Sequence, residues 1–363
     1  MKMRGELEII RSNNVKIEIE VLNACPVCKS DKVKVLYRDL PDLTFFSSDQ
    51  LWRLSKCTVC GSGYLSPRPT KSAISLAYES YYTHDEDNKN SELISNKLLS
   101  AISGRYIRKH TQGGCNNIVD LIIYWFVTFF YPLKTYIDGK CRHLYYFKCK
   151  PLSLLDIGCG SGKFLLFAKN MGWDVVGMDL DAKAIKVAKE KGLEVWEGDI
   201  GQYDIRQQFN VITISHVVEH IYNPKQLLKQ CYRALQPGGY LWIQTPNIDG
   251  IGSYFYKRHW RGLEPPRHLI IFNSKTIRGM LEEIGYESIQ QKYTGLATFY
   301  TFKHSELIRK KEKNLNGSKY TTNKVWLLSK IVVAEIFQIA SLRRNEFVTF
   351  IARKPANSAK NTL

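Results

Sequence analysis

The chain has 363 residues, of which 44% are hydrophobic and 24% are charged, and its mean hydropathy is −0.27. This length accommodates one catalytic domain with a smaller additional unit, and this composition excludes a disordered chain, a collagen-like repeat and a polytopic membrane protein. The net charge of +18 is concentrated in residues 101–150, which carry +6, and residues 301–363, which carry +9. A general nucleic-acid-binding coat would spread this charge over the whole core.

The first residues, MKMRGELEIIRSNN, have no apolar core and therefore do not form a signal peptide. The nine cysteines, an odd number, argue against a secreted disulfide scaffold. Both features predict a cytoplasmic protein.

Four of the cysteines form two C-x-x-C pairs, Cys25 with Cys28 and Cys57 with Cys60, which are 28 residues apart. Each pair aims two thiolates at one point, and two pairs complete a tetrahedral Zn²⁺ site. The spacing exceeds the usual zinc-ribbon gap of about 15–20 residues, and a hairpin or an extra strand would fill it. We predict a structural zinc in a zinc-ribbon-like unit over residues 1–69, with redox exchange or nucleic-acid contact as alternatives.

A helical linker is predicted over residues 70–150. Thr70 follows a Pro-Arg-Pro segment and is suited to cap a helix over 71–82, which contains Tyr78, Tyr81 and Tyr82. A polar loop over 83–92 precedes a second helix at 93–110.

Two apolar runs, at 118–133 and 325–342, coincide with the basic segments of the chain. The first has 13 successive uncharged residues, from Leu121 to Leu133, which is short of the ~20 that a membrane-spanning helix needs. Both runs are compatible with helices packed on the protein's own core or on a second copy, or with apolar faces lying on an anionic membrane. Spanning of the membrane is a third alternative, and the oligomeric state stays open.

From residue 151 onward, short apolar runs alternate with helical segments, which is the pattern of a parallel sheet covered by helices on both faces. This α/β domain is predicted over 151–354, before a disordered tail at 355–363. The runs lie at 152–157, 174–178, 193–196, 209–215 and 239–245.

A glycine-rich turn follows the first of these runs, in the order Asp156-Ile-Gly158-Cys-Gly160-Ser-Gly162. It matches neither a phosphate-binding Walker loop nor a dinucleotide fingerprint, since Lys163 stands where the latter needs its third glycine. Such a turn between a strand and a helix lets the backbone approach a ligand closely.

Two further acids follow the next two strands. Asp179 ends the second strand and is suited to accept the hydroxyls of a ribose. Asp199 follows the third strand, where it can accept from an exocyclic amino group.

These residues resemble the class I S-adenosylmethionine-dependent methyltransferases, in particular the ubiquinone O-methyltransferase-like group, over about residues 151–294. The resemblance implies a Rossmann-like, mostly parallel sheet of seven strands that binds S-adenosylmethionine. It also implies a last, antiparallel edge strand at 346–352, after an insertion at 295–344. The implied cofactor-binding residues are Asp156, Gly158, Gly160, Gly162, Asp179, Asp199 and Ile200.

The fourth strand ends in a segment that contains His216, Glu219 and His220. It resembles the E-x-x-E-H pattern that holds a divalent ion in ubiquinone-pathway O-methyltransferases, but His216 replaces the first glutamate, which argues against magnesium. A general base, a substrate contact, a wall of the cofactor site and a metal ligand all remain possible roles for the two histidines.

A second insertion, at 246–272, contains Arg267 and His268 and is suited to form a substrate wall. Together with the zinc-ribbon-like unit, it resembles methyltransferases of bacterial glycan and sugar biosynthesis. We therefore expect O-methylation of a sugar or glycan hydroxyl, nucleotide- or lipid-linked, with His216, His220 or His268 as base. The alternatives are C-methylation of a keto-sugar, a small quinone-like acceptor, and a zinc-ribbon module that binds nucleic acid.

Overall fold

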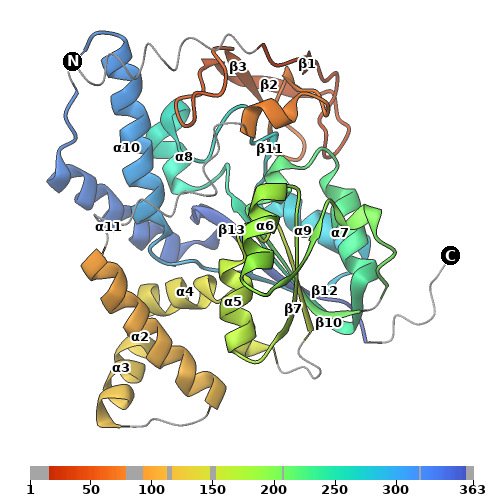
Figure 1. The fold of residues 1–363 in the computed structure, drawn as a ribbon. Helices are drawn as coiled ribbons and strands as arrows, with labels where there is room; N and C mark the ends of the chain where they lie inside the picture. Colours follow the sequence, from red (N-terminus) through yellow and green to blue (C-terminus); the bar gives the residue numbers. More distant parts are fainter. Residues whose placement is uncertain are drawn as a thin grey trace.

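The computed structural model describes residues 16–78, 93–112, 117–147, 153–206, 208–318 and 320–356. A seven-stranded sheet lies at the centre, with a small N-terminal sheet above it and a group of helices beside it in the view of Figure 1.

The central sheet has the strand order β12-β13-β10-β9-β6-β7-β8. Strands β6 to β10 run parallel to one another, and β13 runs antiparallel to its two neighbours, β10 and β12. This confirms the α/β, Rossmann-like prediction. The expectation of an edge position for the last strand is wrong, because β12 forms the edge and β13 lies inside it. The strands are β6 (Ser153–Ile157), β7 (Asp174–Asp179), β8 (Glu194–Glu197), β9 (Phe209–Ser215), β10 (Leu235–Pro246), β12 (Glu287–Lys292) and β13 (Phe347–Arg353).

Helices cover both faces of this sheet because alternate strand residues point to opposite sides. Leu154 and Val211 pack in one core cluster with residues of α5 (Lys163–Asn170) and α6 (Ala182–Glu190). Their neighbours Leu155 and Ile212 pack in another cluster, with α7 (Pro224–Ala234) and α9 (Ser274–Ile284).

The N-terminal sheet has the order β11-β4-β3-β2. The hairpin of β2 (Val33–Leu40) and β3 (Trp52–Cys57) fills the gap between the two C-x-x-C pairs, as expected. Strand β4 (Gly63–Leu65) pairs with β11 (Ile270–Ile271), which comes from the predicted insertion after β10. The N-terminal unit and the insertion therefore share one sheet.

The linker after this sheet differs from its prediction. A two-stranded pair, β1 (Ile19–Glu20) and β5 (Arg68–Pro69), is followed by the 3-10 helix η1 (Ile74–Tyr78) in place of a helix over 71–82. Tyr81 and Tyr82 lie outside the described residues.

Five longer helices lie outside the two sheets: α2 (Leu93–Gln112), α3 (Ile118–Phe129), α4 (Tyr131–Lys140), α10 (Ala297–Leu315) and α11 (Lys324–Ala340). The last two form the predicted insertion at 295–344. Within the described ranges, no single helix has the length and apolarity to cross a membrane, and the pair α3–α4 meets those criteria only jointly, across a bend of 100°. The short helices are η2 (Leu144–Tyr146), η3 (Ile200–Gln202), η4 (Val218–His220), α8 (Ile251–Tyr256), η5 (Lys257–His259) and η6 (Leu342–Arg344).

Glu346, just before β13, fastens this insertion to the domain from a fully buried position. Its carboxyl group accepts from the Gly252 N–H at 2.5 Å and lies 3.3 Å from Trp260 Nε1. Its own N–H donates to Gln338 of α11 at 2.9 Å. Burial raises the pKa of Glu346 from 4.5 to about 7.

We expect the stability of the protein to fall between pH 4.5 and 7 because of this carboxyl group. In that range the unfolded chain releases a proton that the folded chain retains, so the contribution is complete below pH 4.5 and is lost as the pH rises through 7. The variant Glu346→Gln should lose less stability than wild type between pH 5 and 7.5, by about 1–3 kcal/mol. Urea unfolding at both pH values measures the difference, and parallel pH profiles for the two proteins would contradict it.

Candidate active site

The glycine turn lies where the strand order of the central sheet reverses. Strands β6 and β9 are neighbours, but the chain continues from β6 toward β7 on one side and from β9 toward β10 on the other. In open α/β sheets, ligands bind at such a switch point, beyond the carboxyl ends of the strands. The turn at 158–162 and the segment 216–220 both begin there.

Two of the glycines have different roles in this turn. A Cβ atom at Gly158, whose φ is +75°, would lie 2.2 Å from Val217 Cγ2, so glycine allows the turn to pack against the segment that follows β9. A Cβ atom at Gly160, whose φ is +53°, would meet no atom within 4 Å. Gly160 therefore exposes its backbone to open space, where a ligand can approach it closely.

The carboxylate of Asp179 is held against this turn. It accepts from the N–H of Gly160 at 2.7 Å and from the N–H of Asp181 at 2.9 Å. Each carboxylate oxygen keeps further acceptor capacity. Asp179 is thus placed to accept hydroxyl groups of a ligand beside Gly160.

Asp156 supports the turn from inside the domain, since it is 0% exposed. One oxygen, Oδ1, accepts from Thr213 at 2.8 Å and forms an ion pair with Arg142. Its other oxygen, Oδ2, has no hydrogen-bond partner among the described residues. Burial raises the pKa of Asp156, and the charge of Arg142 opposes this rise. Sequence reasoning missed Arg142, which precedes β6 without any motif around it.

The two other predicted cofactor residues lie after β8. Asp199 is exposed, and its carboxylate caps η3 by accepting from the Gly201 N–H at 2.6 Å. The side chain of Ile200 is buried in the core, which leaves its main chain for contact with a ligand.

Glu219, which sequence reasoning did not select, lies at the centre of the histidines after β9. It is fully buried, accepts from the Thr245 hydroxyl at 2.9 Å, and lies 3.3 Å from Nδ1 of His216. Burial opposes its ionisation, but His216 and His220 lower the pKa of Glu219 to about 2. Glu219 is therefore a buried carboxylate at neutral pH.

The three predicted histidines differ in environment. The side chain of His216 is 39% exposed, whereas His268 is buried and donates from Nδ1 to the Gly262 carbonyl at 2.8 Å. Burial lowers the pKa of His268 to about 4, so this ring is neutral at pH 7. Nδ1 of His220 lies 2.9 Å from the Tyr78 hydroxyl and 3.0 Å from the Arg267 carbonyl.

Ligand atoms of Glu219, His220 and His268 lie within 4.8 Å of one another, so these three groups could hold a cation. His216 is not part of that group. Its side chain is 39% exposed, so a ligand can reach it from solvent.

Arg267 connects the insertion with the N-terminal unit and is 0% exposed. Its guanidinium group donates to Glu264 at 3.0 Å and to the Ala77 carbonyl at 2.9 Å, and lies 3.3 Å from Asp42. These contacts position the main chain that meets His220. Arg267 thereby supports the histidine cluster from within the protein.

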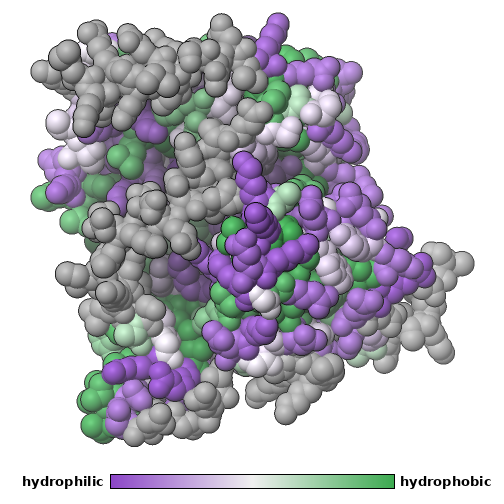
Figure 2. Space-filling model, in the orientation of Figure 1, coloured by the Kyte–Doolittle hydropathy of each residue, from purple (hydrophilic) through white to green (hydrophobic). Residues whose placement is uncertain are grey.

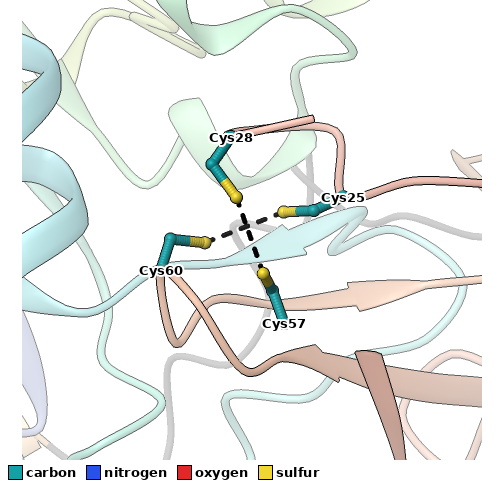
Figure 3. Close-up of side chains that lie close together, drawn as sticks. All are labelled: Cys25, Cys28, Cys57 and Cys60. Atoms are coloured by element: carbon teal, nitrogen blue, oxygen red, sulfur yellow. Dashed lines mark hydrogen bonds between the residues drawn. The ribbon is translucent and has the colours of Figure 1, made fainter. Parts of the chain in front are cut away.

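The four cysteines of the two knuckles converge on one point, as Figure 3 shows. Sγ of Cys25 lies 3.7 Å from Sγ of Cys60, and Sγ of Cys28 lies 3.5 Å from Sγ of Cys57. The hydrogen bond from Cys25 lowers the pKa of Cys60.

The second knuckle is attached to the central domain. The Cys60 carbonyl accepts from the Asn273 amide at 3.1 Å and from the Thr276 hydroxyl at 3.0 Å, both at the start of α9. The cysteine cluster thus lies against the α/β domain.

Residues 136–291 match the family model described as a methyltransferase domain. The sheet order and the glycine turn agree with this match and with the resemblance to class I S-adenosylmethionine-dependent methyltransferases. Among the curated relatives, the ubiquinone biosynthesis O-methyltransferase of Klebsiella pneumoniae is 32% identical over 108 residues, which are 27% of this chain and 43% of the relative. The mitochondrial enzyme of the same name from Saccharomyces cerevisiae is 35% identical over 114 residues, 29% of this chain and 36% of the relative. The chain thus spans less than half the length of these relatives.

Solved structures also resemble the chain. A S-adenosylmethionine-dependent methyltransferase from Archaeoglobus fulgidus has 22% identity and a TM-score of 0.42, and covers 60% of this chain and 93% of its own. Phosphoethanolamine N-methyltransferase 2 from Haemonchus contortus has 17% identity and a TM-score of 0.45, and covers 98% of this chain and 74% of its own.

Proposed function

We propose that this protein transfers the methyl group of S-adenosylmethionine to a hydroxyl group of a sugar or glycan. The observation that carries the proposal is the pair of exposed His216 and buried, ionised Glu219, which lies beside the glycine turn at the switch point of the sheet. A base at this position meets a hydroxyl acceptor where the methyl donor would lie.

The residues around the turn fit the cofactor. Gly160 faces open space, Asp179 presents acceptors for a ribose diol beside it, and Oδ2 of Asp156 is a buried acceptor without a partner among the described residues. Exposed Asp199 would accept from the adenine amino group. The bound sulfonium supplies an activated methyl group, so the protein mainly has to align the acceptor with it, at ~3–3.5 Å.

His216 would act as the general base that takes the proton of the acceptor hydroxyl. The carboxylate of Glu219, 3.3 Å from Nδ1, stabilises the imidazolium that results. His268 is neutral and donates to a main-chain carbonyl, and His220 lies between Tyr78 and Arg267. These two rings are suited to position the acceptor.

The class of acceptor is inferred from polar side chains that three segments of the chain bring together. Tyr78 from the linker, His220 after β9 and His268 from the insertion meet at the site. Hydroxyl and imidazole groups suit a polyhydroxylated acceptor, nucleotide- or lipid-linked. A phenolic, quinone-like acceptor is the second candidate, favoured by the names of the curated relatives; C-methylation of a keto-sugar is the nearest variant of the first.

The acceptor can be tested with S-adenosylmethionine that carries a radiolabelled methyl group. Nucleotide sugars, lipid-linked glycans and a catechol are offered separately, and NMR of the product distinguishes an O-methyl from a C-methyl group. A labelled methyl group attached to an oxygen of the sugar supports the proposal. Transfer to the catechol alone, or to carbon, would replace the proposed acceptor while leaving the methyltransferase intact.

We also propose that the four cysteines bind one structural Zn²⁺ ion, which the convergence of their four sulfur atoms supports. Cys28→Ser should remove the zinc and lower Tm by at least about 5 °C, because the metal holds two knuckles that have no large core of their own. Elemental analysis and a thermal melt measure both effects. Val59→Ser, an exposed position between the second pair of ligands, serves as the control. Wild-type protein that contains no zinc, and a Cys28→Ser variant whose Tm equals that of wild type, would contradict the assignment.

A further inference from the structure

Helix α11 has its polar side facing the protein and its apolar side facing outward. Lys330 lies 3.2 Å from Glu306 of α10, Gln338 donates to Thr298 at 2.8 Å, and Glu335 accepts from the Tyr293 hydroxyl. The opposite side is exposed and apolar, and includes Val325, Trp326, Val332, Val333, Ile336 and Phe337. In a surface helix of a water-soluble domain the apolar stripe faces the core, so this orientation is the reverse of the usual one.

Helix α3 is oriented in the same way. Its single charged residue, Asp120, is 9% exposed and lies 3.5 Å from Arg105 of α2. Its outer side is apolar and aromatic, and includes Ile118, Ile122, Trp125, Phe126 and Phe129.

The two apolar faces are neighbours in the fold. Tyr131, directly after α3, stacks on Tyr293 with ring centroids 5.6 Å apart, and Tyr293 in turn donates to Glu335 of α11. Figure 2 shows hydrophobic side chains at two places on the same side of the molecule, one where Figure 1 places α3 and one where it places α11. Exposed apolar areas of this kind mark interaction surfaces.

The charge around these faces has one sign. Every acidic residue of helices α3, α4, α10 and α11 is buried or half-buried: Asp120, Asp138, Glu306, Glu312 and Glu335. The exposed charged residues next to these faces are cations, among them Lys140, Lys303, Lys324, Arg343 and Arg344.

We propose that the outer faces of α3 and α11 form one membrane-binding surface, which inserts into the headgroup region of a bilayer that contains anionic lipids. An interfacial helix buries its apolar side about 5–10 Å into this region, and lysine and arginine beside it pair with anionic headgroups. Exposed Trp125 and Trp326 suit the same depth. A second copy of the chain on this surface would bring cations against cations, with no exposed acid on these four helices to neutralise them.

The surface can be tested by flotation of the full-length protein with vesicles of phosphatidylcholine, alone or with 30% phosphatidylglycerol. We expect binding to the anionic vesicles and at least about tenfold weaker binding to the neutral ones. Phe129→Glu on α3 and Ile336→Glu on α11 replace side chains that are 79% and 62% exposed, so both variants should fold, which a thermal melt verifies. Each should weaken binding to the anionic vesicles about tenfold or more. Leu51→Glu, at a position 58% exposed in the N-terminal unit, is the matched control and should bind as wild type does.

Three outcomes would overturn this proposal: no flotation with either vesicle, flotation of both variants to the wild-type extent, or a wild-type dimer in sedimentation that Ile336→Glu dissociates while vesicles stay unbound. The last would assign the surface to a second copy. Vesicle binding needs neither methyl donor nor acceptor, so it tests this surface independently of the proposed function.

Discussion

Replacing His216 with asparagine is expected to lower the rate of methyl transfer by about 10²–10⁴-fold, the range that a positioned general base contributes. Asparagine cannot take up the proton of the acceptor hydroxyl, but it is polar and smaller than the imidazole at this 39% exposed position. Cofactor affinity should stay nearly unchanged, because the neighbour that packs against Gly158 of the turn is Val217. Single-turnover transfer of a radiolabelled methyl group measures the rate.

A second variant, at the buried carboxylate of Glu219, tests the same step. Glu219→Gln keeps the size of the side chain and removes its charge, so the imidazolium loses its stabilising neighbour. The effects of substitutions at residues that act together are not additive. The double variant His216→Asn/Glu219→Gln should therefore be scarcely slower than His216→Asn alone. His304→Asn, on α10, is the control and should react as wild type does. A full rate for His216→Asn would assign the proton transfer to another group.

Replacing Asp179 with alanine is expected to weaken S-adenosylmethionine binding by about 10²–10⁴-fold. The carboxylate would accept both ribose hydroxyls, and hydrogen bonds to a charged group are worth roughly 1.5–3 kcal/mol each. It also holds the Gly160 and Asp181 N–H groups at 2.7 and 2.9 Å. Its removal therefore also loosens the turn that the cofactor would contact.

Titration calorimetry measures this loss, with Asp174→Ala as a matched control at the exposed opposite end of the same strand. Asp179→Asn, which retains an acceptor oxygen, should fall between wild type and the alanine variant. Unchanged affinity in Asp179→Ala, or no heat from well-folded wild type, would remove the basis of the proposed function.

Local sequence patterns were sufficient for the parts of the fold that depend on neighbouring residues. The alternation of apolar runs with helical segments located β6 to β10 and their parallel pairing, because burial on both faces requires such runs. The C-x-x-C pairs and the glycine turn were recognisable because their geometry is set within a few residues of chain. Asp179 could be selected since it ends a strand next to that turn.

Contacts between segments far apart in the sequence could not be predicted from such patterns. Nothing near Ile270 or Ile271 indicates that they complete the N-terminal sheet, since β11 has only two residues and its partner β4 lies about 200 positions earlier. Arg142 likewise reaches Asp156 and Thr213 through the packing of the chain before β6. The apolar runs in α3 and α11 were visible, but which side of each helix faces outward depends on the groups that Asp120, Lys330 and Glu335 find in the interior.

The sequence alone determined the α/β class of the domain, the position of its glycine turn and the pairing of the four cysteines in two C-x-x-C motifs, because each of these depends on residues close together along the chain. The tertiary structure decided that buried Glu219 lies among the three histidines, that the side chain of His216 is partly exposed and that two helices turn their apolar sides outward. These features depend on burial and charge pairing between segments far apart in the sequence, and burial is defined only once the chain has folded.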